Sequence, residues 1–361
     1  MQLYIIVAII LVMKLLVSAL EPSANIHLES LINELGESVE LMGIFDKKLG
    51  KSIVDLQSLS IMGFVDAIKK LRFFFALADE MLSLAGEADK VLLIDSSGFN
   101  LPLARKLKKR YPQKEIIYYI LPQAWAWKRG RIKVLEATID RLCSILPFEK
   151  NYYSKNAPIE YVGHPLLDQI KNFKSSTTSE IKRVLFMAGS RRGEIKKLMP
   201  IFKELRSRHN YEAVLVIPKH FTQENIKDLY GNIANFEVSF DAKEAMLEAD
   251  FGFICSGTAT LEASLVGLPF VLVYVAKPLD FFIAKNLVKL KHIGLANIMF
   301  SDFEDSTLHL ELIQDSVSVE NLQKAMQATN RDLFLSNSKK LRSYLVGGSA
   351  INVANIIKRD K

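Results

Sequence analysis

A short polar turn between an apolar run and a helical stretch carries the strongest chemical signal in the sequence. The run that ends at Cys255 predicts a buried strand, and residues 259–266 predict a helix. Between them, Ser256, Gly257 and Thr258 offer hydroxyl groups that can cap the helix, a glycine that lets a ligand approach the backbone, and free helix-start amides. Such a turn is typical of a phosphate site. An ordinary capped turn between strand and helix is the open alternative.

Glu262 and two arginines extend this candidate phosphate site. Glu262 lies one helical turn further on, at about the reach of a ribose attached to the phosphate. Arg191 and Arg192 follow a second apolar run, residues 183–187, in the segment GSRRGE at 189–194. Arginines at such a position clamp phosphate oxygens well, because the guanidinium presents several donors in one plane. Surface ion pairs are the alternative for both arginines.

Carboxylates follow two predicted strands in the first half of the chain. Asp95 comes directly after the apolar run 91–94, where a carboxylate can act as a general base on a substrate hydroxyl. Capping of the next helix is its alternative. Glu21 and Ser23 lie in a polar turn, residues 20–25, after the first strand, and are expected to face the ligand edge of the sheet.

The elements that would position these residues belong to two α/β domains. A chain of 361 residues is too long for one ordinary core and suits two domains of about 150 to 200 residues each. Strands alternate with helices in both halves, and the polar segment 171–180 predicts the linker between them. We place the domains at residues 13–170 and 171–335, and expect the last two helices at about 319–333 and 336–357.

Composition narrows the classes of partner. The net charge of +7 favours an acidic partner, either phosphorylated substrates or an anionic membrane, and nucleic acid ranks last because no binding motif for it is present. The two cysteines lie in apolar segments, which suits buried thiols in a reducing compartment. Histidines show no metal-ligand spacing, and no Asp-x-Asp pair that could hold a metal-bound nucleotide occurs.

Two apolar stretches raise the question of membrane contact. Residues 3–20 are almost wholly apolar, but Lys14 stands inside this run and not before it, and a first strand is expected from Met13. We interpret residues 1–12 as an upstream extension of the reading frame or as an apolar tail. Residues 61–84 combine a broad apolar surface with nearby cations, as at an anionic membrane surface, with core burial as the alternative. The candidate membrane-facing residues are Phe64, Leu71, Phe74 and Phe75.

With these turns assembled, the chain resembles the lipid-A-disaccharide synthases, which are glycosyltransferases of the two-Rossmann-domain GT-B architecture. The resemblance runs from about Lys14 to the end of the chain, and eight motifs occur in the family's order. They are SIMGFVDA at 60–67, IDSSGFN at 94–100, PQAWAWK at 122–128, LPFE at 146–149, VGHPL at 162–166, GSRRGE at 189–194, SGTATLE at 256–262, and Asn297.

The resemblance implies an α/β GT-B fold with a ligand cleft between its domains and a last helix, at about residues 336–361, that crosses back to the first domain. The first domain would bind the acceptor and face the membrane, and the second would bind UDP. The implied reaction transfers a diacylglucosamine from UDP-2,3-diacylglucosamine to the 6-hydroxyl of 2,3-diacylglucosamine 1-phosphate. The anomeric centre inverts, and neither a metal nor another cofactor takes part. The implied location is the cytoplasmic face of the inner membrane, with peripheral attachment, and a homodimer is allowed.

Residue roles follow from the resemblance by matching motifs. Asp95 matches the family's proposed base, and Arg191, together with Arg192, would neutralise the departing diphosphate. The amides of Ser256 to Thr258 would help in place of a cation. Other matched positions are expected to contact substrate. They are Glu262, on the ribose hydroxyls, and Glu21, Ser23 and Asn297, which would line the cleft.

Two departures from the family pattern affect the first domain. The first turn of the family usually reads Ala-Gly-Glu-x-Ser-Gly-Asp, whereas residues 20–25 here read LEPSAN. The base motif usually carries Pro and Asp where Ser97 and Gly98 stand. Since Glu21, Ser23 and Asp95 remain, we interpret the chain as a divergent active branch. The alternatives are another UDP-sugar enzyme on the same fold and a catalytically silent UDP-lipid-binding membrane protein.

Overall fold

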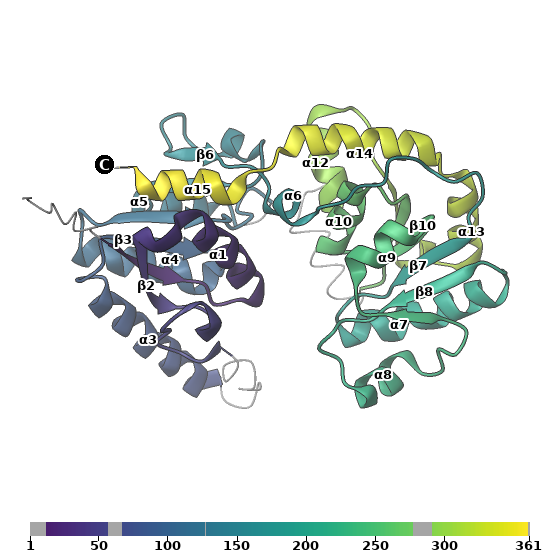
Figure 1. Cartoon of the computed structure of the whole chain (residues 1–361), viewed down its shortest axis with the longest axis horizontal. Helices are drawn as coiled ribbons and strands as arrows, with labels where there is room; N and C mark the ends of the chain where they lie inside the picture. Colours follow the sequence, from purple (N-terminus) through teal and green to yellow (C-terminus); the bar gives the residue numbers. More distant parts are fainter. Residues whose placement is uncertain (1–11, 57–66, 127, 277–290, 360–361) are drawn as a thin grey trace, which may run out of the picture. The chain divides into compact units, whose positions relative to one another are not determined.

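The computed structural model describes residues 12–56, 67–126, 128–276 and 291–359. Residues 1–11 of the predicted extension and Phe64 lie outside the described residues. The chain divides into two compact units (Figure 1). The first comprises Met1–Asp168 with Gly347–Lys361, and the second comprises Gln169–Val346.

A parallel sheet of six strands forms the centre of the first unit, in the order β2-β1-β3-β4-β5-β6. Apolar side chains of β3 and β4 are buried on both faces, which is why these strands appear as unbroken apolar runs in the sequence. The strand order reverses between β1 and β3, so a ligand site is expected where these two strands end. The strands are β1 (Met13–Ser18), β2 (Val39–Ile44), β3 (Lys90–Ile94), β4 (Glu115–Tyr119), β5 (Arg141–Ser144) and β6 (Ile159–Tyr161).

Helices cover both faces of this first sheet. On one face α1 (Pro22–Leu35) packs beside α15 (Ser349–Lys358), and their apolar side chains share a core cluster with β1 and β3. The helix at the end of the chain is therefore part of the first unit, as Figure 1 shows. The opposite face is covered by α3 (Ala67–Leu84), α4 (Ser97–Arg110) and α5 (Gly130–Thr138). The short helix α6 (Pro165–Gln169) follows β6.

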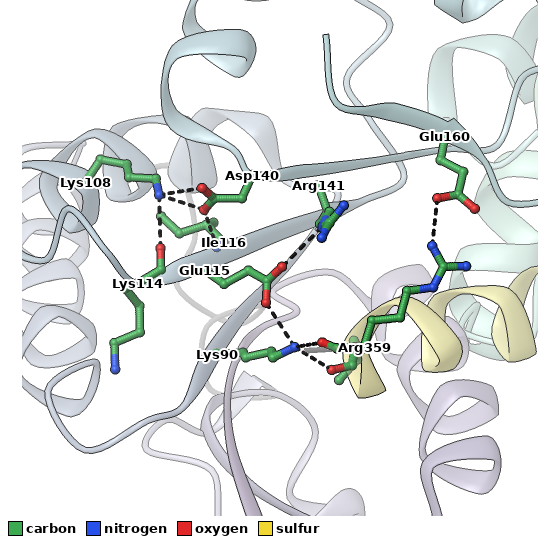
Figure 2. Close-up of polar contacts among 10 residues, drawn as sticks. Lys90, Lys108, Lys114, Glu115, Ile116, Asp140, Arg141, Glu160 and Arg359 are labelled. Carbon is green, nitrogen blue, oxygen red and sulfur yellow. Dashed lines mark hydrogen bonds and ion pairs between the residues drawn. The ribbon is translucent and has the colours of Figure 1, made fainter. Parts of the chain in front are cut away.

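A polar network at the amino-terminal edge of this sheet holds the end of α15 (Figure 2). The Lys90 ammonium donates to the main-chain oxygen atoms of Ile357, at 2.8 Å, and Arg359, at 2.5 Å. It also pairs at 2.9 Å with Glu115, which is 4% exposed and accepts a further bond from Arg141. A buried carboxylate with two cationic partners thus connects β3 and β4 to the end of the chain.

The second unit repeats this plan with a parallel sheet of six strands in the order β12-β11-β10-β7-β8-β9. The order reverses between β10 and β7, so the carboxyl ends of these neighbours form its expected ligand edge. The strands are β7 (Arg183–Met187), β8 (Glu212–Val216), β9 (Glu237–Ser239), β10 (Phe251–Cys255), β11 (Phe270–Tyr274) and β12 (Leu310–Ile313).

Helices also cover the second sheet. An aromatic core centred on Phe186, Phe202 and Phe253 packs α7 (Arg192–Ser207), α8 (Gln223–Tyr230) and α13 (Val319–Ala328) against one face. Three other helices, α10 (Thr258–Val266), α12 (Leu295–Phe303) and α14 (Arg331–Leu345), pack together, and α9 (Ala242–Glu248) lies beside α10.

Two details differ from the sequence prediction. The last two predicted helices are three, α13, α14 and α15, because Gly347 and Gly348 interrupt the second of them and Gly348 has a φ of 87°. The predicted polar turn at residues 20–25 is shorter, because α1 already begins at Pro22. Proline suits the first helical position, where its missing amide hydrogen costs no bond, so residues 22–25 form the first turn of the helix.

Candidate active site

Asp95 and Glu21 lie near each other at the point where the strand order of the first sheet reverses. Asp95 directly follows β3, and Glu21 is the residue before α1, three residues after β1. The Ser96 hydroxyl, between them, donates to Glu21 Oε1 at 3.2 Å. Burial raises the pKa of the Asp95 carboxyl, the negative charge of Glu21 raises it further, and a bond from the Ser96 amide opposes both. A carboxylate in this environment is a stronger base than one in water.

The backbone that carries Asp95 has an uncommon conformation. Asp95 and Ser96 have φ angles of 50° and 43°, in the left-handed region, which costs a non-glycine residue about 1 to 3 kcal/mol. The side-chain amide of Asn100, which is fully buried, donates to the main-chain oxygen of Asp95 at 2.9 Å and to that of Ile94 at 3.2 Å. The Asn100 oxygen accepts the Ser18 hydroxyl at 2.6 Å. The surrounding structure therefore fixes the turn from which the carboxylate projects.

Two hydrophilic residues of α1 differ in environment. Ser23 is exposed in the first turn of α1. Asn25 is buried, and its side chain donates to the main-chain oxygen of Ala19 at 2.9 Å and accepts the Asp46 amide at 2.6 Å. Asn25 therefore fastens the start of α1 to the segment after β2, whereas the role of Ser23 in substrate binding stays a prediction.

A pocket of about 490 Å³ lies at the carboxyl edge of the second sheet. It brings together the two motifs that predict a phosphate site, because β7 and β10, which precede them, are neighbours in the sheet. Residues at the end of β8 and around the start of α9 complete the pocket wall. The lining residues from the two motifs are Gly189, Ser190, Arg191, Glu194, Ser256, Gly257 and Thr258, and Pro218 and Phe240 are among the others.

Residues at the starts of α7 and α10 border this pocket, and helix starts carry amides that have no partner within the helix. The prediction that Ser256 or Thr258 caps α10 is wrong. Gly257 is the residue before the helix, and no described side chain caps it. The Ser256 amide is also engaged, because it donates to the main-chain oxygen of Val273 at 3.2 Å. The amides that remain for an anion begin at Gly257.

The two predicted arginines have different surroundings. The Arg191 side chain is 77% exposed, borders the pocket, and pairs with Glu194 at 2.8 Å. Arg192 pairs at 2.9 Å with Asp228 of α8 and is not among the residues that line the pocket. The structure therefore brings Arg191 to the candidate phosphate site, and for Arg192 it provides the surface ion pair that was the alternative.

Glu262 and Asn297 occupy more buried positions in the second unit. Glu262 is partly buried in α10, and this burial raises the pKa of its carboxyl. Asn297 is fully buried; its amide donates to His309 O and to Glu311, each at 2.9 Å, and its oxygen accepts from Leu308 N at 2.9 Å. These bonds fasten α12 to the segment before β12. Contact of either residue with substrate stays a prediction.

The candidate membrane-facing residues are only partly described. Leu71, Phe74 and Phe75 lie in α3; Phe75 is 55% exposed, whereas Phe74 packs against the core cluster of the first unit. Along the described part of the chain, no helix combines the length and the apolar character that spanning a membrane requires. Over the same residues, no group of three or more His, Cys, Asp or Glu side chains could hold a metal ion.

Sequence reasoning missed two residues that shape these sites. Asn100 stands in the IDSSGFN motif, and only the fold shows that it holds the Asp95 turn. Glu194 ends the GSRRGE motif and enters the pocket beside Arg191. In both cases a hydrophilic residue at the start of a predicted helix was the available signal.

Two α/β units, each with a parallel sheet of six strands covered by helices, are typical of the GT-B class of fold. The structure of Acinetobacter baumannii MurG matches 96% of this chain and 99% of its own, with a TM-score of 0.59 and 14% identity. A putative UDP-N-acetylglucosamine 2-epimerase from Listeria monocytogenes matches 96% of this chain and 94% of its own, with a TM-score of 0.57 and 16% identity. At such identities the similarity shows the fold alone, and it confirms the predicted fold class.

The chain belongs to the lipid-A-disaccharide synthetase family, whose model matches residues 15–348. The lipid-A-disaccharide synthase of Helicobacter pylori (strain HPAG1) is 49% identical over 354 residues, which cover 94% of this chain and 97% of the relative. The Campylobacter jejuni (strain RM1221) enzyme of the same name is 45% identical over 365 residues, with 95% and 98% coverage. The family expected from the eight motifs is confirmed.

Proposed function

We propose that this chain is a metal-independent, inverting glycosyltransferase of lipid A biosynthesis. It condenses UDP-2,3-diacylglucosamine with 2,3-diacylglucosamine 1-phosphate and forms the β-1,6-linked disaccharide 1-phosphate and UDP. The observation that carries this proposal is 49% identity, over almost the full length of both chains, to an enzyme named lipid-A-disaccharide synthase. The GT-B fold alone would not separate this reaction from that of a UDP-sugar epimerase, since both occur on it.

The proposed base is Asp95. Its carboxylate takes the proton of the acceptor 6-hydroxyl as the oxygen attacks the anomeric carbon of the donor, and the carbon–oxygen bond to UDP breaks on the opposite face. Burial and the charge of Glu21, which raise the pKa of Asp95, support this role because they strengthen the base. The fixed turn at Asp95 and Ser96 also supports it, since strained backbone is most often found at functional sites.

The proposed site for the departing UDP is the pocket of the second unit. Negative charge that develops on the diphosphate is neutralised by Arg191 and by the first amides of α7 and α10. Glu262 would bind the ribose hydroxyls. Further substrate contacts are proposed for Glu21, Ser23, Ser256, Thr258 and Asn297, whereas for Arg192 we propose the surface ion pair with Asp228.

Both substrates carry acyl chains, so we place the enzyme peripherally on the anionic cytoplasmic face of the inner membrane. Phe75 supports this proposal because it is a large apolar side chain that is 55% exposed on α3. Lys106 lies 5.8 Å from the Phe75 ring, and its ammonium also pairs with Asp79 at 2.6 Å. Association as a homodimer remains a further prediction.

The test is product formation by the purified chain with both substrates in detergent and excess chelator. The proposal predicts equal amounts of UDP and disaccharide 1-phosphate, and no UDP release with an acceptor that lacks the 6-hydroxyl. UDP release that does not require the acceptor would contradict transfer to this hydroxyl. A reaction abolished by the chelator would contradict metal independence.

A further inference from the structure

A buried carboxylate stands in the pocket that we assign to the diphosphate. Glu194, the third residue of α7, is 8% exposed and lines the pocket together with Arg191 and Gly257. Its place depends on Gly189, which has a φ of 91°. A Cβ atom there would come within 2.6 Å of Glu194 Oε2. The GSRRGE motif thus provides both the carboxylate and the space for it.

Glu194 has a cationic partner and a neighbouring thiol in the pocket wall. Its Oε1 pairs at 2.8 Å with Nη1 of Arg191. The thiol of Cys255, at the end of β10, lines the same pocket, and burial together with the charge of Glu194 raises the pKa of this thiol to about 12. Cys255 therefore stays neutral, and Arg191 provides the cationic partner of Glu194.

A carboxylate at this position repels the diphosphate that we assign to the pocket. The amides of two helix starts and one guanidinium attract an anion, but the negative charge of Glu194 repels it and occupies one donor of Arg191. Between partly buried charges such repulsion is only weakly screened by salt. A pocket optimised only for tight binding of a diphosphate would not contain this group.

We propose that Glu194 is an internal competitor of the diphosphate. It holds Arg191 at the pocket while no nucleotide is bound, and it weakens the binding of UDP so that this product leaves after transfer. The competition acts on the phosphate groups and not on the nucleoside. This inference deepens the proposed function and rests on its assignment of the pocket to UDP.

The test compares UDP with uridine by titration calorimetry on the full chain. Glu194→Gln removes the charge and keeps an acceptor for Arg191, so its UDP dissociation constant is expected to fall by about 10-fold. Its uridine dissociation constant should stay unchanged. Glu204→Gln is the matched control, because Glu204 is an exposed carboxylate on the same helix that pairs with Arg208 at 2.5 Å. This control should change neither constant.

Weaker UDP binding by Glu194→Gln, no change, or an equal change for UDP and uridine would overturn the inference. An equal change would mean that Glu194 only supports the fold of the pocket. If Glu194→Gln does not fold, Glu194→Ala provides a second neutral side chain, and the ratio of the uridine to the UDP constant must rise in it as well. A wild-type chain that binds no UDP would instead contradict the proposed function and the inference with it.

Discussion

The side-chain amide of Asn100 donates to the main-chain oxygen of Asp95 at 2.9 Å, and this bond holds the turn that carries the proposed base. Asn100 belongs to the first turn of α4 and is fully buried, whereas the Asp95 side chain is only partly buried. The hydroxyl of Tyr118 donates to the same oxygen atom. The main-chain oxygen of Asp95 is thus held by two buried side chains, while the Asp95 carboxylate is only partly buried.

Replacement of Asn100 by leucine should therefore lower turnover more than it raises KM. The substitution leaves the Ser18 hydroxyl unpaired and releases the left-handed turn, and the free energy of unfolding should fall by about 1 to 3 kcal/mol. Steady-state kinetics and denaturant unfolding measure the two effects. Asn352→Leu is the control, because Asn352 also bonds a main-chain oxygen, that of Val162, away from Asp95. If both variants lose kcat equally, the positioning role is wrong.

The charge of Glu21 should be visible in the pH dependence of the reaction. Since this charge raises the pKa of Asp95, Glu21→Gln should lower that pKa and move the acid limb of kcat/KM to lower pH. Activity would then persist in more acidic buffer, whatever the change in the maximum rate. Glu29→Gln, an exposed change on the same helix, should leave the limb in place. A shift of the limb to higher pH in Glu21→Gln would contradict this account.

Replacement of the two neighbouring arginines should lower kcat/KM to different extents. Arg191→Ala removes a cation from the pocket and should cost about 2 to 4 kcal/mol of transition-state stabilisation, measured from kcat/KM. Arg192→Ala breaks an exposed pair with Asp228 and should cost less than about 1 kcal/mol. A loss below about 1 kcal/mol in Arg191→Ala as well would leave Arg191 with only its surface ion pair to Glu194.

Lys90 should be important for stability and not for chemistry. Lys90→Met removes one partner of the buried Glu115 and the donor to the end of α15, so the free energy of unfolding should fall by about 3 to 5 kcal/mol. Arg359→Ala breaks only an exposed pair with Glu160 at 3.4 Å, which is worth about 1 kcal/mol or less. Chemical denaturation compares the variants, and similar losses would show that the buried network does not hold α15.

Strands and site turns could be predicted from the sequence because their signals are local. The structure gives β7 the predicted bounds, and it places the turns after β3, β7 and β10 at the carboxyl edges of parallel sheets. A buried parallel strand is an unbroken apolar run, and the hydrophilic residues after it mark the ligand edge.

The partners of hydrophilic side chains could not be predicted, because tertiary packing decides them. Asn297 is fully buried and bonded to the segment before β12, and Arg192 pairs with Asp228 of another helix. The position of Gly257 before α10, with no side-chain cap, is another such case, since the sequence contains two hydroxyl groups that could have capped the helix. The same residue types would have been equally consistent with substrate contact.

Asp95→Asn tests the central claim most directly, with disaccharide formation and UDP affinity measured on the same preparation. Asparagine keeps the size of the side chain but cannot accept the proton of the acceptor hydroxyl. The account predicts that product formation falls by at least about 100-fold while the UDP dissociation constant stays within about 2-fold of wild type. Turnover near the wild-type rate would contradict the role of Asp95 as the base.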